Sequence, residues 1–128
     1  MDAAQALADL TEISSQVESA VLFDESGEVA ASTLPAAAAA ALARAAGELL
    51  DRAAEVSAGG AVTQVEASTP SGSVFVVRDG ARRIAATTVP DPTTGLVFYD
   101  LKSALRGSAP EPKPRRRRTT TAKNGDAA

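Results

Sequence analysis

The order of helical and strand segments along this chain constrains its fold more than any single motif. The two kinds of segment are distinguished by the spacing of their apolar residues. A helical period covers residues 3–16, and a second runs from Pro35 to about residue 57. A third helical period follows Gly95 and ends near Gly107. The segments between them have strand character, over residues 19–24, 28–33, 61–69, 73–78 and 82–89. The sequence therefore predicts the element order α-β-β-α-β-β-β-α.

Turn signals and two apolar runs indicate how the strands are joined and covered. Asp24-Glu25-Ser26-Gly27 places Asp and Gly at the turn positions they favour, and Asp79-Gly80 is a strong two-residue hairpin signal. The runs at 20–23 and 74–77 are apolar at every position, as in strands that are buried on both faces. We therefore expect an α+β domain over residues 1–108, with helices on both faces of its sheet.

The long central helix is predicted to have two apolar faces. Its charged residues gather in one arc of roughly 100°, whereas apolar and small residues occupy roughly 200°. The stripe expected to cover the sheet is Leu42, Ala45, Ala46, Leu49, Ala53 and Val56. The dimer interface is expected to form from Leu50 and the small residues around it, so that the four interface residues are Ala43, Gly47, Leu50 and Ala54. The alternative is that this second face is exposed to solvent and packs against nothing, because alanine is tolerated on exposed helix faces and this chain is rich in alanine.

The composition excludes most catalytic chemistry. The chain has no His and no Cys, so it lacks the commonest general base, the commonest metal ligand and any thiol nucleophile. Gly59-Gly60 is an isolated pair without the spacing of a phosphate-binding loop. Asp24 and Glu25 could be a catalytic or metal-binding pair, but a solvated hairpin tip is the better interpretation. We expect no enzyme activity and no catalytic, cofactor-binding or metal-binding residues.

The ends of the chain indicate a cytoplasmic protein with a basic tail. No basic stretch precedes Arg44, and no apolar run reaches the roughly 18 residues that span a bilayer. Residues 1–109 carry 7 basic and 14 acidic residues, a net charge of −7, and residues 110–128 carry 6 and 2, a net charge of +4. Residues 109–128 are predicted to be a disordered basic tail. Its basic block, expected to bind an anionic partner weakly, is Arg115, Arg116, Arg117 and Arg118.

Over about residues 5–107 the chain resembles the Roadblock/dynein light chain family. The resemblance lies in Leu7-Ala8-Asp9-Leu10 before the first hairpin, in the hairpin Phe23–Val29, in Gly59-Gly60 after the long helix, and in Asp91–Val97. It implies a five-stranded antiparallel sheet between helices, as in the Roadblock/profilin-like sandwich. It also implies a homodimer that pairs through the long helix and an edge strand into a continuous ten-stranded sheet. Bacterial proteins of this type regulate small Ras-like GTPases, often beside sensor kinases.

Three functions are therefore open. The first is a non-catalytic homodimeric scaffold that regulates a small Ras-like GTPase, with a sensor kinase or a paralogue as a further partner. The second is a small-molecule-sensing module of similar fold, for which Arg78, Arg82 and Arg83 near the strand ends are the candidate ligand-binding residues. The third is a nucleic-acid-associated protein that acts through the basic tail, although the acidic body and the lack of an aromatic platform oppose it.

Overall fold

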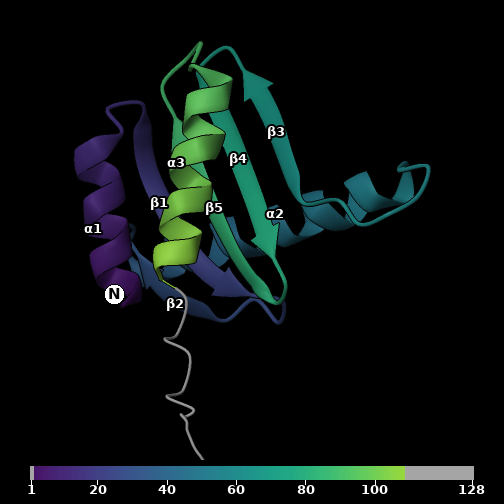
Figure 1. Ribbon diagram of the computed structural model, residues 1–128, viewed down its shortest axis with the longest axis horizontal. Helices are drawn as coiled ribbons and strands as arrows, with labels where there is room; N and C mark the ends of the chain where they lie inside the picture. Colours follow the sequence, from purple (N-terminus) through teal and green to yellow (C-terminus); the bar gives the residue numbers. More distant parts are fainter. Residues whose placement is uncertain (1, 109–128) are drawn as a thin grey trace, which may run out of the picture.

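The computed structural model describes residues 2–108 and has the predicted order of elements (Figure 1). The helices are α1 (Ala3–Ile13), α2 (Ala36–Glu55) and α3 (Thr94–Gly107). The strands are β1 (Val17–Asp24), β2 (Val29–Ser32), β3 (Gln64–Thr69), β4 (Gly72–Asp79) and β5 (Arg82–Thr88).

The five strands form one antiparallel sheet in the order β2-β1-β5-β4-β3. Hairpins join β1 to β2, β3 to β4 and β4 to β5, whereas the central pair β1 and β5 comes from distant parts of the chain. That central pairing runs from Val17 opposite Thr88 to Asp24 opposite Arg82. The short strand β2 and the strand β3 are therefore the two edges of the sheet.

Helices cover both faces of the sheet, as the apolar runs predicted. In Figure 1, α1 and α3 lie in front of the sheet, and α2 crosses behind it. The front core contains Phe75, which is fully buried and meets the ring of Phe98 edge-on, with the ring centroids 4.9 Å apart. The rear core is built from Val21, Phe23, Val76 and Ala85 of the sheet and from one stripe of α2. The predicted α+β sandwich is confirmed.

Two predicted boundaries were wrong by three residues each. Helix α1 ends at Ile13 rather than near residue 16, because Ser14 adopts an extended backbone and the chain has already entered β1 at Val17. Strand β3 begins at Gln64 rather than residue 61. Gly59 and Gly60 both have positive φ values, and this left-handed backbone turns the chain before β3 can begin to pair.

The first hairpin is closed by the carboxylate of Asp24. Its Oδ1 accepts hydrogen bonds from the backbone N–H and the hydroxyl of Ser26, at 2.9 and 2.6 Å, and from the N–H of Glu28 at 3.0 Å. Gly27, at φ +89°, donates its N–H to the Asp24 carbonyl. These bonds, the Ser26 hydroxyl foremost, lower the pKa of Asp24 from its usual 3.8. Asp24 is therefore part of a hairpin tip, as the sequence indicated.

This lowered pKa predicts a pH-dependent effect of Asp24→Asn. Because the folded state favours the carboxylate, the stabilisation is present above pH 3.8 and is lost as the pH falls through the lowered pKa. The variant, which resembles the protonated acid, should melt below the wild type at pH 7 and together with it at about pH 2. Thermal unfolding at both pH values checks this. Glu25→Gln removes a charge from the same tip and should melt like the wild type; equal behaviour of the two variants would contradict the assignment.

Candidate interaction surface

Helix α2 packs on the sheet with a face that differs from the predicted one. Its buried stripe is Ala39, Ala43, Ala46 and Leu50, each at most 2% exposed. Ala43 and Leu50 therefore lie in the rear core and cannot present a dimer interface, which corrects the prediction for these two residues. Ala45 and Val56, which were expected to cover the sheet, are exposed. At 100° per residue the helix is rotated by roughly 80° from the predicted orientation.

The rotation has a physical reason that was available in the sequence. Alanine is small on every side, so hydrophobicity alone does not distinguish one part of a broad alanine arc from another. The charges do, because each of them must reach water. The face opposite the arc of Arg44, Glu48, Asp51, Arg52 and Glu55 is centred on Ala39, Ala46 and Leu50, and this is the face that is buried.

The corrected packing leaves an apolar ridge along the other side of α2. We define the α2 ridge as Leu42, Ala45, Leu49 and Val56, at spacings of three, four and seven residues. Leu42 and Leu49 are half-buried against the rear core, Ala45 is exposed, and Val56 is 85% exposed just beyond the last helical residue. Figure 1 shows this end of α2 running out past the edge strand β3. The ridge thus continues from the part of α2 that covers the sheet onto the C-terminal end of the helix, which projects beyond β3 and is called the overhang below.

The edge strand β3 lies beside this overhang with one side free among residues 2–108. All six of its residues pair with β4 alone, so the N–H and C=O groups that point away from β4 are open to a further strand. Beside the first residues of β4 and the last residues of β5 lies a shallow hollow of about 240 Å³, whose lining includes Val74 and Thr87. The α2 ridge and the free edge of β3 therefore lie next to each other.

The other two predicted interface residues occupy different places. Gly47 is half-buried beside Arg83: a Cβ there would lie 3.8 Å from an Arg83 guanidinium nitrogen. Ala54 is exposed, on the opposite side of the buried stripe from the ridge. Sequence reasoning assigned the ridge residues to the core, and the position of the charged arc was the signal that could have corrected it.

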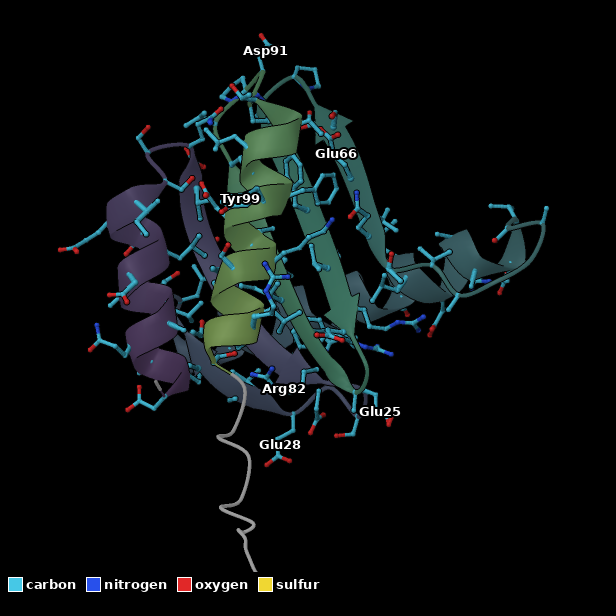
Figure 2. The ribbon with its side chains drawn as sticks, in the orientation of Figure 1. Glu25, Glu28, Glu66, Arg82, Asp91 and Tyr99 are labelled. Atoms are coloured by element: carbon cyan, nitrogen blue, oxygen red, sulfur yellow. The ribbon has the colours of Figure 1, made fainter. Side chains whose placement is uncertain are left out.

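The three arginines considered for ligand sensing do not converge on one site. Arg82 belongs to the front face, where its guanidinium donates to the Leu105 carbonyl at 2.9 Å and to the Ser108 hydroxyl, so it holds the end of α3. Arg83 and its cross-strand neighbour Arg78 belong to the rear face. Arg82 appears at the foot of α3 in Figure 2. Arg82 thus has a structural role at the end of α3, and together with Arg83 it also lines a hollow of about 340 Å³.

Three further results concern residues 2–108 only. No group of three His, Cys, Asp or Glu side chains in this range could hold a metal ion. None of the helices described here combines the length and apolar character that crossing a membrane requires. The basic block Arg115–Arg118, with the rest of the predicted tail, lies outside the described residues, and its anionic partner remains a prediction.

Comparison with solved structures identifies the fold. A Roadblock/LC7 domain from Streptomyces avermitilis superposes with a TM-score of 0.76 at 20% identity, over 84% of this chain and 94% of that one. MglB of Myxococcus xanthus gives a TM-score of 0.69 at 14% identity, over 81% and 89%. The gliding protein MglB of Thermus thermophilus gives 0.64 at 16%, over 83% and 84%. No protein-family model and no curated protein sequence matches the chain. The chain has the Roadblock/LC7 fold that its sequence pattern indicated.

Proposed function

We propose that this protein is a non-catalytic, homodimeric scaffold that regulates a small Ras-like GTPase in the cytoplasm. The observation that supports it is the combination of a Roadblock/LC7 fold with an open β3 edge beside an overhanging apolar helix. The fold suggests the class of function through the family resemblance, and the surface suggests how two copies assemble.

In the proposed dimer the β3 strands of two copies pair along residues 64–69 and extend the sheet to ten strands. Each overhang then reaches across the seam, where Val56 and the rest of the α2 ridge would meet the rear face of the other copy. Burying Val56, now 85% exposed, removes apolar surface from water and favours association. The two charged arcs of α2 would remain exposed together, as a polar surface for a folded partner.

A regulator of this composition would act by positioning groups of the GTPase. The chain has no His and no Cys to serve as a general base or nucleophile. Phosphoryl transfer depends mainly on positioning and electrostatic stabilisation, so a scaffold that orders the catalytic loops of the GTPase can change its rate without supplying chemistry. A sensor kinase or a paralogue is a further partner of the same scaffold.

The substitution Val56→Asp should weaken the dimer. An unpaired carboxylate in an interface core costs about 1–3 kcal/mol, which raises the dissociation constant about 5- to 150-fold. Folding should be unaffected, because the side chain is 85% exposed in the single chain. Sedimentation analysis between about 1 and 100 µM measures the shift. The matched control is Ile13→Asp, which places a carboxylate at a 73% exposed position on the front face and should leave the dimer intact. A wild type that is monomeric throughout this range would contradict the interface.

The regulatory role is tested with the GTPase itself. The protein, immobilised, should retain a Ras-like GTPase from a lysate of its own host, identified by mass spectrometry. The purified GTPase should then change its rate of GTP hydrolysis or nucleotide exchange when the wild type is added, and much less with Val56→Asp. Tight binding of GTP by this protein alone, measured by calorimetry, would overturn the proposal.

A further inference from the structure

The front layer of the molecule contains a groove that the proposed function does not use. It lies between α1 and α3 and encloses about 330 Å³. Its apolar lining includes Leu10 and two of the most exposed large side chains in residues 2–108, Ile13 at 73% and Tyr99 at 65%. Figure 2 shows Tyr99 beside α3, on the side towards α1. A large aromatic ring and an isoleucine left in water beside a groove are typical of a surface that is covered by another segment.

A buried carboxylate lines the same groove. Asp100 is only 8% exposed, yet within residues 2–108 its carboxylate accepts no hydrogen bond and forms no ion pair. Asp9, from α1, is a second acidic lining residue, and its one hydrogen-bond donor in this range is the amide of Gln5 at 2.9 Å. The Asp100 carboxylate opens onto the groove and has no partner within residues 2–108, so a cationic group that enters the groove can pair with it. An apolar floor, an exposed aromatic ring and a buried acid together fit a proline-rich, basic segment.

The chain itself carries such a segment shortly after the end of α3. Helix α3 ends at Gly107, which lines the groove, and the following sequence is Pro110-Glu111-Pro112-Lys113-Pro114-Arg115. Proline at every second position favours a polyproline II conformation, which rises about 3.1 Å per residue. The eight residues from Ser108 to Arg115 then span about 25 Å, whereas the return along α3 from Gly107 to Asp100 is only about 10 Å. The segment is long enough to turn back, and the net +4 charge of the tail complements the acidic groove.

We infer that the groove between α1 and α3 binds the protein's own segment 110–118. In this arrangement prolines contact Tyr99 and Ile13, and Lys113 or Arg115 pairs with Asp100. Because the segment is tethered to the end of α3, its effective concentration is in the millimolar range, so weak contacts suffice for occupancy. This inference concerns the front face and is independent of the proposed dimer on the rear face.

The absence of cysteine makes a direct test possible in the full-length protein. Thr119→Cys introduces a single thiol, to which a nitroxide spin label is attached. Paramagnetic broadening of backbone amide signals then maps the residues near the label. We expect the signals of Leu10, Ile13 and Ser103 to be broadened at least twofold more than that of Arg52 on the rear layer. The difference should decrease between 50 and 500 mM salt, because ion pairs with a basic segment are screened.

Substituting a residue that lines the groove distinguishes specific binding of the segment from chance encounters between the tail and the body of the protein. Asp100→Asn is nearly isosteric and should reduce the broadening of Ile13 at least twofold. Asp51→Asn on α2 removes the same charge from the rear layer and should leave the broadening unchanged.

Tyr99 is the sole tyrosine in a chain without tryptophan, so quenching of its fluorescence by acrylamide gives a second readout. Replacing Arg115–Arg118 by serine should make Tyr99 more accessible. Broadening spread evenly over both layers, or seen only from labelled to unlabelled copies in a mixed sample, would overturn the inference.

Discussion

Phe75→Ala should lower the free energy of unfolding by about 3–5 kcal/mol, the range for removing a large aromatic side chain from a packed core. Phe75 is 0% exposed, lies on a central region of β4, belongs to the front core and meets the ring of Phe98 on α3 edge-on. No neighbouring element can close the space without shifting, because the strand is paired on both sides with β3 and β5. Urea unfolding followed by circular dichroism measures the loss.

The comparison variant is Leu96→Ala. Leu96 is a large apolar residue on α3, but it is 49% exposed, so its truncation should cost less than about 1 kcal/mol. Similar losses for the two variants would mean that the front core is not centred on Phe75.

Gly72→Ala should destabilise the domain by about 2–4 kcal/mol through two additive causes. Gly72 has φ +152°, a region that is strained for residues with a side chain. In addition, a Cβ at this position would stand well inside van der Waals contact of the Thr88 carbonyl oxygen. Backbone on the central strand β5 cannot move aside as a flexible side chain would. Thermal and urea unfolding should both show the loss.

Gly95→Ala is the matched control. Gly95 lies in the first turn of α3, and a Cβ there would meet nothing within 4 Å. Alanine is the better helix former, so this variant should be as stable as the wild type or more stable by up to about 1 kcal/mol. If Gly72→Ala were as well tolerated as Gly95→Ala, the close approach of β4 to Thr88 would be contradicted.

The elements were predictable because local chemistry determines them. Pro35 and Gly59-Gly60 bracket α2, Asp79-Gly80 marks the β4–β5 turn, and the apolar runs at 20–23 and 74–77 required cover on both faces. The boundaries of α1 and β3 were less predictable, because they depend on where pairing with a distant strand begins. Val17 continues the helical period in sequence, yet it pairs with Thr88 in the sheet.

The sequence predicted that α2 has a second packing face, but it assigned the wrong residues to that face. A helix with a broad apolar arc indicated two packing faces, but the choice between Ala43 and Ala45 as the inward residue depends on how α2 sits on the sheet. Methyl groups of equal size give no signal for that choice, and the sequence signal that does, the position of the charged arc opposite Ala39, Ala46 and Leu50, was not used. The groove beside Asp100 was not predicted, because it arises where α1 and α3, about 90 residues apart in sequence, lie side by side.

The central pairing of β1 with β5 imposes a delay during synthesis. Strand β1 is the most continuously buried strand, and β5 ends 64 residues after β1 does. At about 5–20 residues per second, a ribosome takes roughly 3–13 s to add that length. Throughout this interval the nascent chain holds Val21, Leu22 and Phe23 with β2 as their only strand neighbour. A hydrophobic edge exposed for seconds is a target for chaperones and a risk for aggregation, so the yield of folded protein should depend on translation rate more than its small size suggests.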